Sequence, residues 1–309
     1  GRMEKFIETV PVMKLEPQDI DNLMGELREY HAIYSPLFGR REQRGQSEQY
    51  LQGLLLDIPN KAIEPMVLAQ QGADPNAIRA RQHFVSAGVW ADELILKRHW
   101  QEVDRDLGED EGVFTLDGSD FAKQGEDSVG VKRQYCGELG KVANCQAGVF
   151  LGYASRKGYT LLDRRLYVPE EWVTDETYAE RRQKCGVPAE IEFKTKPELS
   201  WEMLAAVHQA GTLRGRWVAC DEAFGRDTAL LDQVDGIGWW YYAEVPHDTL
   251  VWTERPATVV PEWSGQGRKP SRLGLVAGEP VPQSVSAIAQ ALPADRWSRH
   301  TIKEGSKGP

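Results

Sequence analysis

The 309-residue sequence contains no apolar run that approaches the roughly 18–20 residues needed to cross a lipid bilayer. Its first residues also lack the charged segment followed by an apolar stretch that directs a chain to export. Both absences predict a cytoplasmic protein without membrane contact. The hydrophobic content of 41% and the charged content of 27% are typical of a soluble globular protein. At this length the chain can form one large domain or two to three smaller ones.

Cysteine and histidine are few, and their spacing is uninformative. The four cysteines form no Cys-x-x-Cys pair, and the six histidines form neither His-x-His nor His-Glu-x-x-His. Metal sites built from these residues need such spacings. A histidine-rich metal site and a Cys–His nucleophile therefore have little support. Reduced thiols are expected in a chain without an export signal, and Cys220 lies in an apolar run that predicts a buried strand.

Positive charge is in deficit overall but not everywhere. The net charge of −10 and the pI near 5.3 argue against nucleic acid as a partner. Residues 121–165, however, contain eight basic and four acidic side chains. A locally basic face on an acidic protein can still bind a phosphate backbone, with an affinity that falls as salt rises.

The first third of the chain has helical periodicity. Leu23, Met24 and Leu27 continue a pattern that begins near Pro17, and residues 47–56 present a second apolar stripe. Further short helices fit residues 77–85 and 90–100. These patterns predict an all-α amino-terminal domain over residues 1–110.

The pattern changes to strands at Gly112. Short apolar runs and helical stretches follow in the order strand, hairpin, helix, strand, helix, strand, at residues 113–116, 142–154 with 159–168, 197–211, 217–220, 228–234 and 238–245. This order predicts an RNase H-like α/β core with a mixed sheet over residues 111–245. The segment after Pro246 is rich in proline, glycine and charge, with strand-like pieces at 249–253 and 272–276.

Two aspartates carry the predicted chemistry. Asp117 and Asp221 each follow a short apolar strand, so their carboxylates converge if the two strands are neighbours. Paired carboxylates hold hard divalent cations such as Mg²⁺, and two such ions about 4 Å apart promote phosphodiester cleavage. Spacing alone is weak evidence, because an aspartate at a strand end is more often a helix cap or a turn residue.

Several long segments resemble, in order, those of bacterial insertion-sequence transposases of the DDE type, specifically the seven-oh-one group. They are 116–125 (LDGSDFAKQG), 128–137 (SVGVKRQYCG), 139–146 (LGKVANCQ), 164–172 (RRLYVPEEW), 195–199 (TKPEL) and 217–225 (WVACDEAFG), preceded by 50–55 (YLQGLL) and 61–65 (KAIEP). The resemblance covers nearly the whole chain, and many long segments in order are more specific than a short motif.

The resemblance implies a DDE transposase that cleaves DNA and transfers strands in a metal-dependent reaction. Asp117 and Asp221 would be the first two catalytic, metal-binding carboxylates, with Mg²⁺ or Mn²⁺ as the ion. The implied partners are transposon-end and target DNA, together with a second copy of the chain in a homodimer on DNA. The helical amino-terminal domain would bind the transposon end.

The resemblance also implies a third carboxylate, a glutamate that follows a β-rich insertion. In the family it falls beyond the stretch that resembles residues 297–309, so residues 246–309 would be the start of the insertion. As written, the chain is not expected to be a complete nuclease. A second departure is Asp120, where the family often has another residue; we expect a solvated turn residue, with a substitute metal ligand as the alternative. Glu222 is expected to face away from Asp221.

Basic residues near Asp117 are candidates for DNA contact: Lys123, Lys132, Arg133, Lys141, Arg164 and Arg165. For the first four, the alternative is a role in solubility or in salt bridges to Glu126, Asp127 and Glu138. For Arg164 and Arg165 the alternative is the exposed edge of a strand. Further candidates are the Arg40, Arg41 and Arg44 cluster and the loop at residues 267–270. Residues 239–242 (WWYY) are expected in the core rather than in a base-stacking surface.

Two other functions compete with an active transposase. One is a truncated or domesticated relative that binds DNA or a protein partner without cutting, which the net acidity and the missing glutamate favour. The other is an unrelated RNase H-like nuclease that acts on RNA or on repair intermediates.

Overall fold

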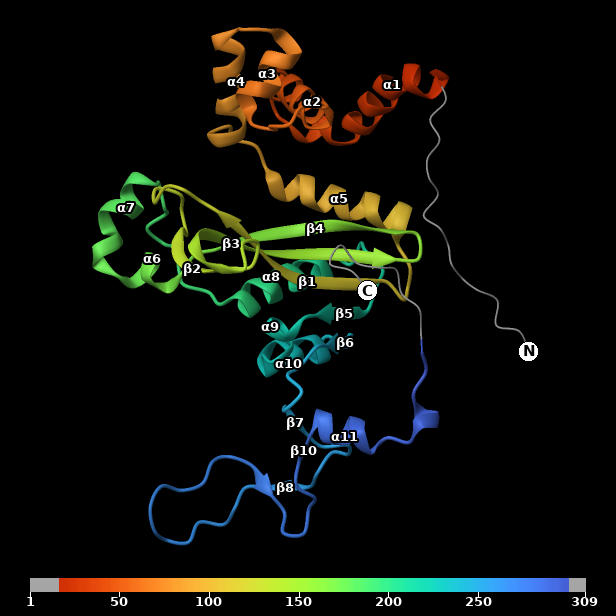
Figure 1. Cartoon of the computed structure of the whole chain (residues 1–309), viewed down its shortest axis with the longest axis vertical. Helices are drawn as coiled ribbons and strands as arrows, with labels where there is room; N and C mark the ends of the chain where they lie inside the picture. Colours follow the sequence, from red (N-terminus) through yellow and green to blue (C-terminus); the bar gives the residue numbers. More distant parts are fainter. Residues whose placement is uncertain (1–16, 300–309) are drawn as a thin grey trace, which may run out of the picture. The chain divides into compact units, whose positions relative to one another are not determined.

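The computed structural model describes residues 17–299 (Figure 1). The described residues divide into two compact units: the first runs to Asp106 and includes Ala210–Leu213, and the second comprises Leu107–Gln209 and continues from Arg214. Within the described residues, no helix combines the length and the apolar character that crossing a membrane requires.

The first unit is helical. Its elements are α1 (Pro17–Tyr34), η1 (Ser35–Leu37), α2 (Arg41–Leu55), α3 (Ile63–Gln71), α4 (Pro75–Ser86) and α5 (Asp92–Leu107). Asp74 begins α4 by accepting hydrogen bonds from the backbone N–H groups of Asn76 and Ala77, at 2.8 and 3.3 Å. Phe38, Phe84 and Trp90 form an aromatic cluster with ring centroids 5.7–5.8 Å apart.

The second unit is built on a six-stranded mixed sheet. Its strands are β1 (Val113–Ala122), β2 (Lys132–Cys136), β3 (Lys141–Ser155), β4 (Gly158–Tyr167), β5 (Trp217–Cys220) and β6 (Trp240–Ala243). The order is β2-β3-β1-β5-β6, and β4 also pairs with β3 to form the long hairpin visible in Figure 1. β1, β5 and β6 run parallel, whereas β1 and β3 are antiparallel. The predicted mixed sheet in an α/β unit is therefore confirmed.

One face of this sheet forms the core of the second unit. Phe114 and Leu116 of β1, Leu151 of β3 and Val218 of β5 are all buried. In β1 and β5 the buried residues alternate with more exposed neighbours, as expected for strands with one face against a core. Helix α8 (Lys196–Ala210) adds buried side chains at Leu199, Met203, Leu204 and Val207. Cys220 is also buried, as its apolar strand predicted.

Strand β4 contains a β-bulge that interrupts this alternation. Leu151 of β3 pairs with Asp163, but the next residue, Gly152, pairs with Leu161, so Leu162 has no partner in the ladder. Leu162 and Asp163 are consecutive and both buried. Odd-numbered and even-numbered residues of β4 therefore exchange sides of the sheet at the bulge.

Short helices complete the second unit. They are α6 (Glu170–Thr174), η2 (Glu176–Tyr178), α7 (Ala179–Lys184), α9 (Glu222–Gly225) and α10 (Thr228–Gly236). The segment after β6 contains β7 (Leu250–Val251), β8 (Thr258–Val259), β9 (Gly274–Leu275), β10 (Gln283–Ser284), α11 (Val285–Ala291) and η3 (Ala294–Arg296). Among its described residues, β10 pairs with β7 and β8 pairs with β9.

The prediction that residues 239–242 lie in the core is wrong for three of the four. Trp239 is buried and stacks on Phe114 with a centroid distance of 4.5 Å. Trp240, Tyr241 and Tyr242 are 50%, 44% and 72% exposed. The physical reason is that β6 is the last strand of the sheet, so its side chains are flanked by those of a neighbouring strand on one side only.

Candidate active site

Asp117 and Asp221 lie next to each other across two parallel strands. The ladder between β1 and β5 ends with the pair Leu116 and Cys220, and each aspartate is the next residue. Adjacent strands are about 4.8 Å apart, and paired residues in a parallel ladder face the same side of the sheet. Leu116 and Cys220 face the core, whereas Asp117 and Asp221 are exposed. The register therefore brings the two predicted carboxylates together on the face opposite the core.

Asp117 does not end its strand, contrary to the prediction. β1 continues to Ala122 because it stays paired with β3, in which Phe150 is the partner of Asp117. β5 stops at Cys220, so β1 loses its parallel neighbour immediately after Leu116. The end of β5, rather than the end of β1, makes the edge of β1 at Asp117 accessible.

Backbone hydrogen bonds hold both carboxylates. Oδ1 of Asp117 accepts the N–H of Gly118 at 2.7 Å. Oδ1 of Asp221 accepts the N–H of Ala223 at 2.9 Å and so caps α9. Within residues 17–299, neither carboxylate forms an ion pair with a lysine or an arginine. Two neighbouring negative charges without a cation repel each other, and a bound metal ion would remove this repulsion.

The donor set fits a hard divalent cation. Carboxylate oxygens are the ligands that Mg²⁺ prefers, and this ion is commonly bound through one or two carboxylates with water or phosphate oxygens in the remaining positions. Across the described part of the chain, no group of three or more histidine, cysteine, aspartate or glutamate side chains could hold a metal ion. The site formed by Asp117 and Asp221 thus resembles an ion site shared with water or substrate rather than an all-protein cage.

Glu244 is a residue that the sequence analysis missed. It follows β6, and its N–H donates to the carbonyl of Cys220 at 3.0 Å, which continues the parallel ladder. Asp117 within β1, Asp221 after β5 and Glu244 after β6 therefore lie in one row across three neighbouring strands. The backbones of the outer two are two strand spacings apart, about 9.6 Å. The predicted strand at residues 238–245 contained this residue, but only the ladder register places it in the row.

Two other acidic residues near the pair are engaged elsewhere. Oδ2 of Asp120 accepts the N–H of Gly137 at 2.7 Å, so this carboxylate joins β1 to the turn between β2 and β3. Asp120 is part of β1, not of a turn as expected. Glu222 pairs with Arg226 at 2.9 Å.

Three of the six predicted DNA-contacting residues are bound to acidic side chains. Lys132 pairs with Glu171, and this hydrogen bond raises the pKa of Lys132. Arg164 and Arg165 both bind the buried carboxylate of Asp163, at 3.2 and 2.8 Å. Arg164 pairs with Phe150, the residue that also pairs with Asp117, so Arg164 lies in the same row as the candidate site.

The other three, Lys123, Arg133 and Lys141, form no ion pair among the residues that the structure describes. Arg133 and Lys141 are exposed on the β2–β3 ladder, and Lys123 directly follows β1. The proposed bridges to Glu126, Asp127 and Glu138 are wrong. Glu126 binds Arg181, Asp127 binds Lys184, and Glu138 accepts the N–H of Ala122.

Lys196 is a second residue that sequence reasoning missed. A Cβ atom added to Gly118 would lie 4.0 Å from its Nζ, and the same Nζ lies 5.5 Å from the ring centroid of Tyr167. Lys196 therefore places a positive charge beside the β1 residue that follows Asp117. Lys196 lies in residues 195–199, one of the segments that resemble the transposases. Nothing in the sequence spacing, however, predicted that it would lie near Asp117.

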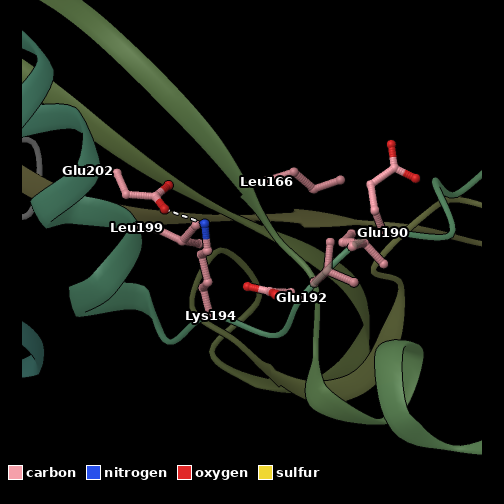
Figure 2. A pocket seen from close by; sticks show the side chains of 8 residues that line it. Leu166, Glu190, Glu192, Lys194, Leu199 and Glu202 are labelled. Atoms are coloured by element: carbon pink, nitrogen blue, oxygen red, sulfur yellow. Dashed lines mark hydrogen bonds and ion pairs between the residues drawn. The ribbon is translucent and has the colours of Figure 1, made fainter.

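A separate hollow of about 310 Å³ lies beside the end of β4 (Figure 2). Leu166 and Leu199 supply apolar walls, and Lys194 reaches across to Glu202. With Glu190 and Glu192 also on its walls, the hollow carries three carboxylates and one ammonium group. Its negative charge makes it unsuitable for phosphate.

The sequence of residues 34–309 matches the family described as DDE superfamily endonuclease. No curated protein matches the chain. Endonucleases of this superfamily act on DNA and generally use divalent metal ions, which agrees with two unpaired carboxylates brought together by the β1–β5 ladder. Because the match covers most of the sequence, the chain belongs to the DDE superfamily endonucleases.

Proposed function

We propose that this protein is the transposase of a bacterial insertion sequence of the seven-oh-one group, built on an RNase H-like core. It would cleave DNA at the transposon ends and join them to target DNA. Residues 111–245 would form the catalytic core, residues 1–110 would bind the transposon end, and residues 246–309 would begin the insertion domain. The family match and the six-stranded mixed sheet support this proposal.

The observation that carries the proposal is the register of β1 and β5. It aligns Asp117 with Asp221 on one face of the sheet, where both are exposed and neither has a basic partner among residues 17–299. We assign both residues as ligands of Mg²⁺ or Mn²⁺. When bound, the ion supplies a Lewis acid that stabilises the attacking and leaving oxygens of a phosphodiester.

The residues of the chain position this chemistry. Backbone hydrogen bonds to Oδ1 hold each aspartate, and the ion would bind the remaining carboxylate oxygens. Lys123, Arg133 and Lys141 would bind DNA phosphates on the adjoining β2–β3 surface, and Arg164 would lie in the row of Asp117. The reaction would be attack on phosphorus by water and then by a freed 3′-hydroxyl, without a covalent enzyme intermediate.

The test is cleavage of a duplex that carries the terminal repeat of the element, with Mg²⁺ or Mn²⁺ added to the full-length protein. We expect cleavage that stops on chelation and falls at least about a hundredfold in Asp117→Asn or Asp221→Asn, because metal-ion stabilisation of the transition state amounts to several kcal/mol. Asp120→Asn is the matched control, since its amide oxygen can still accept the N–H of Gly137. Unchanged cleavage in either of the first two variants would remove that residue from the site.

A second candidate is a transposase-derived protein that binds DNA or a protein partner without cutting. The observation in its favour is that Lys132 is paired with Glu171, and that Arg164 and Arg165 share Asp163. Binding of terminal-repeat DNA without metal-dependent cleavage would support this candidate. Binding that does not change with salt would indicate a protein partner.

A further inference from the structure

Helices α3 and α4 of the first unit are joined as a helix–turn–helix. α3 ends at Gln71, and α4 begins at Pro75 after only three residues. Gly72 opens this turn with a φ of 75°, a conformation that glycine adopts without strain. α2 contacts both helices, so the three pack as one group (Figure 1). A short turn with glycine between two helices of such a group is typical of DNA-binding domains in which the second helix reads the major groove.

One face of α4 packs against α2 and α3. Arg81 and Phe84 on this face are buried. The guanidinium of Arg81 binds no carboxylate among the described residues and donates instead to three glutamine oxygens: those of Gln46 and Gln49 in α2, at 2.6 and 2.5 Å, and of Gln70 in α3, at 3.4 Å. These bonds hold α4 in place and leave the positive charge of Arg81 without a negative partner within residues 17–299.

The opposite face of α4 carries side chains that can read base edges. Asn76, Arg79 and His83 recur at spacings of three and four residues, so they lie along one side of the helix, and all three are exposed. In the major groove, arginine donates two hydrogen bonds to guanine, and asparagine pairs with adenine. The groove is about 12 Å wide and admits an α-helix.

The charge around α4 suits a polyanionic partner. Among the α-helices described in the first unit, α4 alone contains neither aspartate nor glutamate. Asp74 directly precedes it, but this carboxylate is held by the two N–H groups that it caps. Residues 40–90, which include α2, α3 and α4, contain six basic and five acidic side chains, whereas the whole chain has a net charge of −10. The net acidity that argues against nucleic acid therefore lies outside this group of helices.

A hollow of about 540 Å³ joins the exposed face of α4 to the start of α2. Its walls include His83 and Ala87 of α4 together with Arg40 and Gln43. Glu42 is the only carboxylate among the residues that line it. Arg40 therefore borders the same surface as the base-reading side chains. A basic residue beside a helix in the groove can bind the DNA backbone and fix the register of the protein on the duplex.

We propose that α4 enters the major groove of the transposon end, where Asn76, Arg79 and His83 contact base edges. Arg40 contacts a neighbouring phosphate. The inference rests on the proposed function and adds to it how the end is recognised: by its sequence, through one helix of the first unit, independently of the metal site.

The test is fluorescence anisotropy of the full-length protein in the presence of a chelator, with a labelled duplex from the end of the element and a shuffled duplex of the same composition. We expect tighter binding to the element end. Asn76→Ala and Arg79→Ala are each expected to lower this affinity about tenfold, with little effect on the shuffled duplex, because a lost base contact removes discrimination. Arg40→Ala is expected to weaken binding to both duplexes by a similar factor, since a phosphate contact carries no sequence information.

Lys97→Ala is the matched control, because Lys97 is exposed on α5 and its removal takes away the same charge as Arg79→Ala. Its preference for the element end is expected to equal that of the wild type. An unchanged preference in Arg79→Ala and Asn76→Ala, or no preference in the wild type, would overturn the inference.

Chelation separates the inference from the cleavage proposal. Metal-dependent cleavage together with a preference that does not depend on α4 rejects the role of α4 alone. A preference that depends on α4, without metal-dependent cleavage, supports the role of α4 and rejects the nuclease.

Discussion

Leu116 and Cys220 pair in the parallel ladder between β1 and β5, and an aspartate follows each of them. The separation of Asp117 and Asp221 is therefore set by strand pairing rather than by flexible loops. Side chains presented by a sheet are held more precisely than side chains on loops, as a metal site requires. The same ladder buries Leu116 and Cys220 in the core, so the core and the candidate site depend on one register.

Metal binding is expected to depend on both aspartates. Asp117→Asn and Asp221→Asn each remove one negative charge and one ligand, so we expect Mn²⁺ affinity, measured by isothermal titration calorimetry, to fall at least about tenfold in each. The double variant is expected to lose binding without a change in circular dichroism. Asp120→Asn is expected to bind Mn²⁺ like the wild type. Loss of Mn²⁺ binding in Asp120→Asn would instead indicate that the metal site lies on the other side of β1.

The salt dependence of DNA binding reports which basic residues contact phosphates. Each contact contributes about 0.9 to the slope of log affinity against log salt on duplex DNA. Removing Lys123, Arg133 and Lys141 together is therefore expected to reduce the slope by up to about 2.7. Lys132→Ala is expected to change it less, because Glu171 already pairs with this lysine. Fluorescence anisotropy between about 50 and 200 mM salt measures both slopes, and equal slopes in the triple variant and the wild type would argue against this surface.

Gly225 is expected to tolerate no side chain. A Cβ atom there would lie 2.1 Å from the carbonyl oxygen of Glu244, which is backbone and cannot move without shifting the end of β6. Overpacking of this kind usually costs about 1–3 kcal/mol, so Gly225→Ala should lower the free energy of unfolding by about that amount in urea titrations. Gly236→Ala, where nothing lies within 4 Å, is the control and is expected to be neutral or slightly stabilising. Equal stability of the two variants would contradict the close contact.

His31 is expected to make the first unit sensitive to mild acid. Burial lowers the pKa of His31, whose Nε2 lies 2.7 Å from the hydroxyl of Ser47. Below pH about 6.5 the unfolded chain binds a proton that the folded chain resists, so stability should fall as the pH drops from 6.5 toward the lowered pKa. His31→Gln is expected to flatten the fall in thermal midpoint over this window. A parallel decline in both proteins would show that His31 is not the cause.

Sequence patterns predicted those parts of the fold in which apolar periodicity is strong. The helical first unit, the β3–β4 hairpin, α8 and β5 all follow from it, with boundaries displaced by a few residues. The ends of β1 were not predictable, because Asp117-Gly118-Ser119 has the composition of a turn. Pairing with β3 nevertheless keeps residues 117–122 extended. Tertiary pairing outweighs local preference here.

The candidate site could be predicted in part. Each aspartate after an apolar strand was visible, but the row that adds Glu244 depends on the register of three strands, which sequence does not specify. The partners of the basic residues were not predictable either. Asp163 became the acceptor for Arg164 and Arg165 because the bulge buries it, and strict alternation along β4 would not place it so.

The unpaired Leu162 also bears on how related chains should be compared. It is the one residue of β4 that the ladder skips, so a relative that lacks it would have a regular strand with every remaining pair unchanged. A one-residue alignment gap at this point would therefore leave Arg164 opposite Phe150, in line with Asp117. A gap elsewhere in the strand would reverse the sides of the residues beyond it and place different side chains beside the aspartates.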